Sequence, residues 1–258
     1  MLRFPIMESG EKDKEREMHD ELKIPATTPA EGYLRLLDII RLLRRECPWD
    51  REQDHKSLRV CLLEEAYEAA DAIDREDMDN LREELGDVLL QVVFHSILAE
   101  EEKQFTATDI INDECEKMIR RHPHIFENEE SNTVDKVLEK WENIKVREHQ
   151  GTTFEERLRS VPRALPALTK SQKVLSKAKQ CGYDWDDGLD LFKRISKLSG
   201  ELADDKAVLT AEPEGKLGNL LLLCTAAAVL AGIGPEHALE KAADDFVERA
   251  IAGDATLR

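Results

Sequence analysis

Two pairs of acidic residues mark the stretch from residue 62 to residue 93. Glu65 and Glu68 are three positions apart, and Glu84 and Asp87 repeat this spacing. Residues at i and i+3 lie on one face of a helix, so each pair would place two carboxylates side by side. Two such pairs close together in a chain suggest a site that binds a cation.

Apolar residues flank both acidic pairs: Leu62, Leu63, Ala66, Ala69, Ala70, Leu81, Leu85, Val88, Leu89 and Val92. We expect these residues to form buried stripes, so the carboxylates should lie close to a core. Like charges held together near a core are costly unless a cation joins them. A hard divalent metal, which prefers oxygen ligands, is the simplest such cation. The structural alternative is a solvated helix face, where a single acidic pair with this spacing is common.

The acidic stretch is predicted to form two long helices joined by a tight turn. The first is expected from about residue 57 to 73, with Ser57 as its N-cap, and the second from about residue 78 to 103. Residues 74–77 allow only a short connection, so the two helices must be antiparallel neighbours. The acidic pairs then face each other, because each lies at a similar distance from the turn.

Further helices are predicted on both sides of this hairpin. One should run from residue 29 to 46, with Pro29 at its first position. In the loop that follows, Trp49 is expected to anchor a core, because tryptophan usually serves packing. Two more helices are expected over about 108–122 and 134–149. The low Gly and Pro content and the absence of β-type alternation favour an all-α fold.

A basic cluster ends the helix expected over 108–122. Lys117 and Arg121 share a face at i,i+4, and Arg120 lies beside them. On the next predicted helix Trp141 and Lys145 have the same spacing, which suggests an aromatic platform with a phosphate-binding cation. Two structural alternatives exist: cations at a helix C-terminus complement its dipole, and a tryptophan often packs in a core or an interface.

Composition limits the possible partners and compartments. The chain has 258 residues and a formal net charge of −18, which argues against a nucleic-acid polymer as the main ligand. Five dispersed cysteines without a C-x-x-C pair indicate a reduced, cytoplasmic protein. No signal peptide is evident. The apolar run from residue 217 to 233 is short for a membrane span, and we interpret it as a buried helix, so no membrane association is expected.

The acidic segment has an echo later in the chain. Residues 85–90 (LGDVLL) return as 217–222 (LGNLLL), at an offset of 132 positions. In this register, with a gap of one residue upstream, Glu64 corresponds to Lys197, Glu65 to Leu198, Glu68 to Glu201, Glu84 to Lys216 and Asp87 to Asn219. The second copy therefore keeps its apolar spacing and loses the carboxylate set. We expect it to fold like the first without holding the same metal.

These patterns predict the order of the domains. Residues 1–28 form a mobile leader, 29–150 a first repeat with the intact metal site, 151–168 a linker, and 169–258 a degenerate second repeat.

The ordered set of motifs resembles that of the MazG-type nucleoside triphosphate pyrophosphohydrolases, members of the all-α NTP pyrophosphatase superfamily. The matching segments are EExxE at 64–68, CPWD at 47–50, ELGD at 84–87, RRHPHIF at 120–126 and WExxK at 141–145. The resemblance covers about residues 30 to 250 and is most specific in the first repeat. Single acidic pairs occur by chance in many helical proteins, whereas this ordered set does not.

The resemblance implies tandem helical bundles of the four-helix type, usually assembled as a homodimer. It implies hydrolysis of NTPs or dNTPs to monophosphate and pyrophosphate with Mg²⁺, for which Mn²⁺ is a possible substitute. By motif, Glu65, Glu68, Glu84 and Asp87 would bind the metal, and Lys117, Arg121, Trp141 and Lys145 would contact the nucleotide. Because the second repeat departs from the acidic pattern, we expect hydrolysis in the first repeat and a structural role for the second.

The chemistry that follows is attack of a metal-bound or neighbouring water on the α-phosphorus. Pyrophosphate then leaves, with its charge offset by the metal and by Lys117, Arg120, Arg121 or Lys145. Glu64 and Glu68 are both candidates for the group that takes the proton from water.

Other functions are compatible with parts of the sequence. A di-iron carboxylate bundle requires Glu-x-x-His steps, but His95 does not lie three residues after a candidate site acid. A non-catalytic scaffold or nucleotide sensor is a second alternative, which the degenerate repeat makes conceivable. A relative specific for dUTP or phosphoribosyl-ATP is a narrower enzymatic alternative, and the RRHPH and CPWD motifs favour the MazG type itself.

Overall fold

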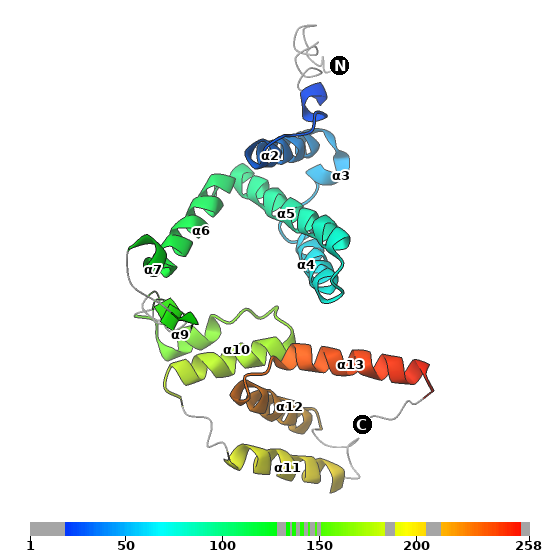
Figure 1. Cartoon of the computed structure of the whole chain (residues 1–258), viewed down its shortest axis with the longest axis vertical. Helices are drawn as coiled ribbons and strands as arrows, with labels where there is room; N and C mark the ends of the chain where they lie inside the picture. Colours follow the sequence, from blue (N-terminus) through cyan, green and yellow to red (C-terminus); the bar gives the residue numbers. More distant parts are fainter. Residues whose placement is uncertain are drawn as a thin grey trace, which may run out of the picture. The chain divides into compact units, whose positions relative to one another are not determined.

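The structure is a computed structural model that describes residues 19–127, 133, 134, 136, 137, 140, 141, 144, 148, 151–183, 189–204 and 213–253. All regular elements formed by these residues are helices, which confirms the predicted all-α class (Figure 1). The chain divides into two compact units, Met1–Ile144 and Lys145–Arg258.

The helices named in the first unit are α2 (Pro29–Glu46), α3 (Pro48–Arg51), α4 (Arg59–Asp74), α5 (Met78–Glu101), α6 (Ala107–Arg121) and α7 (Pro123–Phe126). Helix α2 begins at Pro29, as the sequence predicts, and Thr28 and Glu31 form a capping box at this start. Helix α4 packs along α5, which confirms the predicted helical hairpin. Helix α6 also starts with a capping box, formed by Thr106 and Asp109.

The predicted cap of α4 is wrong. Helix α4 begins at Arg59 and its N-cap is Leu58, which makes no side-chain cap. The hydroxyl of Ser57 donates to the side-chain oxygen of Gln53 at 2.8 Å instead. The carboxylate of Asp54 accepts the backbone N–H groups of Lys56 and Ser57, so this turn closes on itself before the helix starts.

The core of the first unit lies between α2 and the C-terminal half of α5. Its buried members are Leu37, Ile40, Leu58, Val93, Phe94, Ile97, Leu98 and Ala107. Trp49 does not belong to this core: 60% of it is exposed, so the prediction that it anchors packing is wrong. Leu58 and Phe94 belong to the core, whereas Trp49 lies on α3 as an exposed residue.

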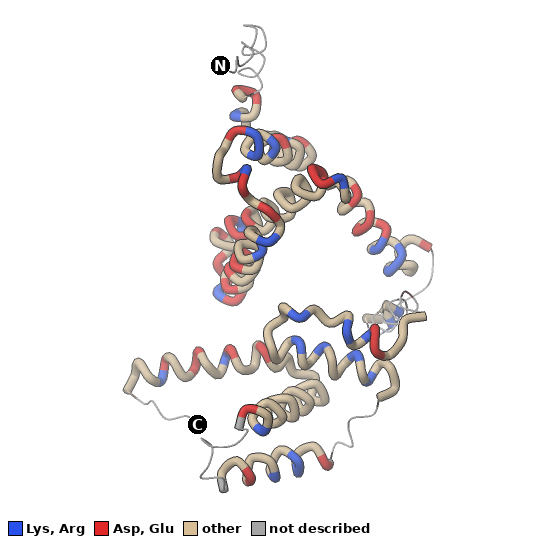
Figure 2. The backbone as a smooth tube through the Cα atoms, turned by 180° about the vertical axis from the view of Figure 1, so that it is seen from behind, with Lys and Arg blue, Asp and Glu red and all other residues tan. Residues whose placement is uncertain are grey.

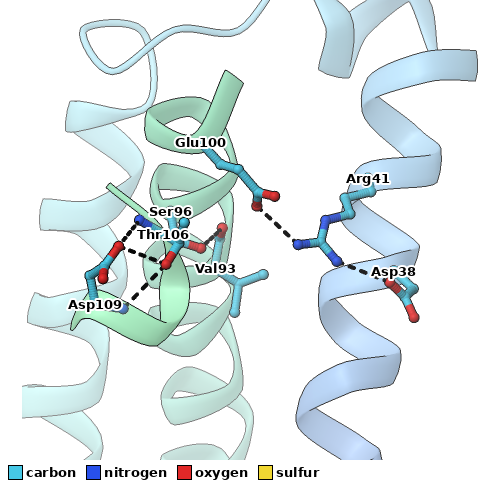
Figure 3. A network of polar contacts seen from close by, with 7 residues as sticks. All are labelled: Asp38, Arg41, Val93, Ser96, Glu100, Thr106 and Asp109. Carbon is cyan, nitrogen blue, oxygen red and sulfur yellow. Dashed lines mark hydrogen bonds and ion pairs between the residues drawn. The ribbon is translucent and has the colours of Figure 1, made fainter. Parts of the chain in front are cut away.

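Polar contacts join the helices around this core (Figure 3). The guanidinium of Arg41 on α2 donates to Asp38 at 3.2 Å and to Glu100 of α5 at 2.9 Å. Close by, the backbone N–H of Thr106 donates to the carboxylate of Asp109 at 2.8 Å, and this contact fixes the start of α6. The Arg41–Glu100 contact thus joins α2 to α5, and the Thr106–Asp109 contact caps α6.

Arg44 holds the loop between α3 and α4. One terminal nitrogen of its guanidinium donates to the backbone carbonyls of Asp50, Arg51 and Gln53 at 2.6, 3.0 and 3.0 Å. The other two nitrogens donate to the carboxylate of Glu101 at 3.0 and 2.5 Å. Only 12% of this side chain is exposed. A single arginine therefore ties an irregular loop to the end of α5.

The leader predicted over residues 1–28 falls largely outside the described residues, which begin at residue 19. Its last part is held on α2. The ring of His19 contacts the carboxylate of Glu46 at 3.1 Å, and Arg35 donates to the carbonyl of Leu22 at 2.7 Å.

The second unit contains α9 (Phe154–Arg159), α10 (Ala167–Gln180), α11 (Leu189–Asp204), α12 (Pro213–Leu230) and α13 (Pro235–Ile251). Helix α12 packs on α10 and α11, and α13 packs on α10. The segment predicted to be a linker contains α9, which starts with a capping box of Thr153 and Glu156 and packs on α10.

Helix α12 is buried on only one side. Thr225 and Ala226 are almost inaccessible, whereas 52% of Leu217 is exposed. The predicted helix over this apolar run is present, and its expected burial holds for one side of the helix only. No single helix among the described residues is long and apolar enough to cross a membrane, although α12 and α13 pass this test as a pair bent by 108°.

Candidate metal centre and active site

The helical hairpin of α4 and α5 brings three predicted site residues together. Carboxylate oxygens of Glu65, Glu84 and Asp87 all lie within 4.8 Å of one another. Glu84 is buried, with 8% of its surface exposed, and the other two are half-buried. This cluster arises because the short turn after α4 sets the two helices antiparallel at the expected register.

The other two predicted acids lie at the edge of this cluster. Glu68 is exposed, and its carboxylate shares a hydrogen bond with that of Glu84. Glu64 is also exposed, and its charge acts on neighbouring Glu65. The structure thus places the four predicted metal ligands in one region of the hairpin, with Glu64 beside them.

The surroundings of the cluster disfavour its negative charge. Burial raises the pKa of the Glu84 carboxyl, and the charge of Glu68 and the hydrogen bond to it raise that pKa further. Burial likewise raises the pKa of Glu65, followed by the charges of Asp87 and Glu68. A divalent cation would remove this penalty, and a donor set made only of carboxylate oxygens suits Mg²⁺ or Mn²⁺.

The apolar residues that flank the acids are only partly buried. Ala69 faces the inside of the unit, but Leu85 is 53% exposed, and Leu89, Val92 and Leu63 are exposed as well. The expectation that these stripes form the core is therefore wrong for one chain by itself. Both helices of the hairpin thus leave large apolar side chains exposed, and we use the name hairpin face for the exposed side chains of Val60, Leu63, Tyr67, Leu85, Leu89 and Val92.

The basic cluster lies at the C-terminal end of α6. Lys117 forms an ion pair with Glu114 one turn earlier, and Arg120 and Arg121 occupy the last turn. Helix α6 starts beyond the C-terminal end of α5 and runs away from the α4–α5 hairpin (Figure 1). Among the described residues of one chain, the basic cluster lies at the far end of α6 and is not brought to the acidic cluster of the hairpin.

The predicted aromatic platform lies near the same end of α6. The rings of Trp141 and His122 are 5.5 Å apart between centroids and tilted by 56°. Trp141 is half-buried. Lys145 lies outside the described residues.

A pair of histidines was not predicted from the sequence. The Nδ1 atoms of His55 and His95 are 2.8 Å apart, and their ring planes differ by only 7°. His55 belongs to the loop before α4 and His95 to α5, forty positions later. No local spacing links the two residues, so only the packing of the loop on α5 reveals the contact.

The fold and the site together define an all-α protein that presents an oxygen-donor cluster on a helical hairpin. A family profile described as the MazG nucleotide pyrophosphohydrolase domain matches residues 53–126, the segment that contains both acidic pairs and the basic cluster. The chain belongs to the MazG family, which confirms the resemblance carried by the motifs.

Two relatives support this assignment over most of the chain. The nucleoside triphosphate pyrophosphohydrolase/pyrophosphatase MazG of Thermotoga maritima is 39% identical over 216 residues, which cover 83% of this chain and 82% of that protein. The nucleoside triphosphate pyrophosphohydrolase of Escherichia coli K12 is 38% identical over 221 residues, which cover 83% of this chain and 84% of that protein.

Proposed function

We propose that the first unit hydrolyses nucleoside triphosphates to nucleoside monophosphate and pyrophosphate with Mg²⁺ as cofactor, for which Mn²⁺ can substitute. The observation that carries this proposal is the convergence of Glu65, Glu84 and Asp87 oxygens within 4.8 Å, inside the segment matched by the family profile. The names of the two relatives supply the substrate class and the leaving group.

We assign Glu65, Glu68, Glu84 and Asp87 as the residues that hold the metal. When bound, the ion supplies Lewis acidity, which lowers the pKa of coordinated water and neutralises phosphate oxygens. Glu68 would contribute a ligand oxygen from the edge of the cluster, where its carboxylate is a neighbour of the Glu84 carboxylate. Without a cation this carboxylate set would repel a polyanionic substrate.

We assign Glu64 as the residue that accepts the proton of the attacking water. It lies next to Glu65 on the same helical turn, is exposed, and is not needed in the ligand set. Glu68 is less suited to this role because we assign it to the ligand set. Attack of the water at the α-phosphorus requires no covalent intermediate with the protein.

The leaving pyrophosphate needs cations, and the chain supplies them at the end of α6. Lys117, Arg120 and Arg121 would hold its oxygens, together with Lys145. Trp141 would stack on the base, since the Trp141 ring lies among the aromatic side chains at the end of α6.

The separation of acids and cations within one chain favours a homodimer with shared active sites. The hairpin face consists of large apolar side chains that are exposed on the two helices that carry the acidic cluster, and exposed apolar patches mark association surfaces. A second copy that covers this face would bury those side chains and bring its own α6 cations to the acids. The five free cysteines are consistent with such an assembly working in the reducing cytoplasm.

Release of pyrophosphate from a panel of nucleoside triphosphates tests the proposal. With Mg²⁺ the intact chain should release pyrophosphate and not orthophosphate from the substrate. The double change Glu65→Ala and Asp87→Ala removes one ligand from each helix and should lower the rate at least about 100-fold. The matched control, Asp71→Ala with Asp79→Ala, removes one exposed acid from each helix and should keep the rate near that of the intact chain. Pyrophosphate release that survives the first change would refute the assignment.

A further inference from the structure

A groove runs between α11 and α12 in the second unit. Its cavity measures about 420 Å³, within the usual range for small-molecule sites. The lining residues are Arg194, Lys197, Leu198 and Glu201 from α11, and Asn219, Leu222 and Leu223 from α12. Two helices thus contribute polar groups to one hollow, with leucines between them.

The polar lining of the groove is rich in donors of hydrogen bonds. Arg194 and Lys197 carry positive charges one turn apart, and Asn219 faces them from α12 with a neutral amide. The single acid, Glu201, lies 4.0 Å from Lys197, and both side chains are well exposed, so this ion pair is weak. An anion in the groove would therefore meet two cations and one amide, with the carboxylate of Glu201 as the one opposing charge in the lining.

The rest of α12 adds little charge of its own. Figure 2 shows α11 with both basic and acidic positions, whereas α12 is uncharged beyond its first turns. Glu214 and Lys216 are the charged residues of α12, and half-buried Lys216 lies one turn before Asn219. The charged residues that line the groove are therefore those of α11: Arg194, Lys197 and Glu201.

The sequence register relates this groove to the metal cluster of the first unit. Lys197, Leu198, Glu201 and Asn219 line the groove, and they occupy the positions of Glu64, Glu65, Glu68 and Asp87. The two helix pairs also match in arrangement, since α11 and α4 both have 16 residues and each packs on the following helix. At the corresponding place the groove thus has a lysine, a leucine and an asparagine where the first unit has acids, and it keeps one acid, Glu201.

We propose that the α11–α12 groove binds a diphosphate or triphosphate group directly, without a divalent cation. This site lies beyond the proposed hydrolytic function of the first unit. Arg194 offers a planar fork that matches two phosphate oxygens, and Lys197 adds a second charge. Leu198, Leu222 and Leu223 form the apolar part of the lining beside these contacts. The ligand is either free pyrophosphate or the phosphate chain of a nucleotide.

Calorimetric titration of the whole chain in EDTA tests the proposal, because chelation removes metal-dependent binding at the first unit. The probes are inorganic pyrophosphate and α,β-methylene-ATP, with adenosine as the ligand that lacks phosphate. We expect both phosphate probes to bind, adenosine not to bind, and affinity to fall as salt rises. Tighter binding of α,β-methylene-ATP than of pyrophosphate would identify a nucleotide as the ligand, and the reverse would identify free pyrophosphate.

Substitutions separate the groove from other basic surfaces. Arg194→Gln with Lys197→Gln should weaken binding at least about tenfold. The matched control, Lys193→Gln with Lys241→Gln, removes the same charge from exposed positions outside the groove and should retain binding.

Three outcomes would overturn the proposal: binding that persists in the groove variant, an equal loss in the Lys193 and Lys241 control, or a strict requirement for Mg²⁺. Thermal melting of each variant shows whether a loss of binding reflects unfolding. The titration needs no catalysis, so its result is independent of whether the first unit hydrolyses nucleotides.

Discussion

Glu83 and Glu84 are neighbours of the same type with different surroundings. Glu83 is exposed, while Glu84 is buried against the acids of α4 and has a raised pKa. The i,i+3 spacing with Asp87 was enough to select Glu84 from the sequence, because the helical period decides which of two adjacent acids faces the partner helix. Its hydrogen bond to Glu68 could not be predicted, since that depends on side-chain positions across the hairpin.

The His55–His95 contact leads to a prediction about pH. Burial and the neighbouring His55 lower the pKa of His95 below its ordinary value of 6.5. The unfolded chain therefore binds a proton more readily than the folded chain as pH falls through this region. The stability that this contact contributes should be complete above about pH 6.5 and should decline as pH falls toward the lowered pKa.

Urea unfolding of the intact chain and of His95→Gln at pH 7.5 and pH 5.5 measures this contribution. The loss of unfolding free energy between the two pH values should be smaller in His95→Gln than in the intact chain. His237→Gln, which changes an exposed histidine of α13, should leave the loss unchanged. Equal losses in all three proteins would contradict the assignment.

Arg44 leads to a prediction at the level of the elements it joins. Replacement by Met keeps much of the side-chain volume but leaves three carbonyls of the α3–α4 loop and Glu101 without this donor. We expect Arg44→Met to lower the free energy of unfolding by about 2–4 kcal/mol. Arg45→Met, one position later on the exposed side of α2, should cost less than about 0.5 kcal/mol. Urea unfolding measures both changes, and a similar small cost for the two variants would show that Arg44 does not hold the loop.

Helices were predictable from the sequence where local signals define them. Thr28 and Pro29 fixed the start of α2, and the turn after residue 73 fixed the hairpin. The exposure of Trp49 was not predictable, because it follows from the way Arg44 gathers the surrounding loop. The sequence around a tryptophan in a short loop does not indicate whether its side chain is buried or exposed.

Shared active sites would have a measurable signature in the whole assembly. A chain with Asp87→Ala lacks an intact acidic cluster, and a chain with Arg121→Ala lacks an intact basic cluster. In a mixed dimer, one of the two sites combines the intact halves. Co-production of the two variants should restore about a quarter of the normal rate of pyrophosphate release, because half of the dimers are mixed and each has one complete site.

Each variant alone provides the control for this mixing experiment and should be nearly inactive. A mixed preparation no more active than the variants alone would show that each site is built within one chain. Co-production with the intact chain checks that the variants assemble and do not poison their partner.

The whole molecule is where prediction from the sequence was weakest. The apolar positions around the acids were identified correctly, but they were assigned to a core, whereas Leu85 and Leu89 lie on the outer face of the hairpin. A pattern shows which side of a helix is apolar and does not show what covers it. For the second unit, the sequence shows that acids of the first repeat are replaced. The groove itself depends on the packing of α11 on α12, which the sequence does not show.

The direction in which α6 leaves the hairpin has a consequence for kinetics (Figure 1). If cations and carboxylates meet only between two chains, a single chain is catalytically incomplete. In dilute solution the number of complete sites then grows with the square of the chain concentration, until nearly all chains are paired. The amount of protein that a cell makes would set its specific activity as well as its total activity.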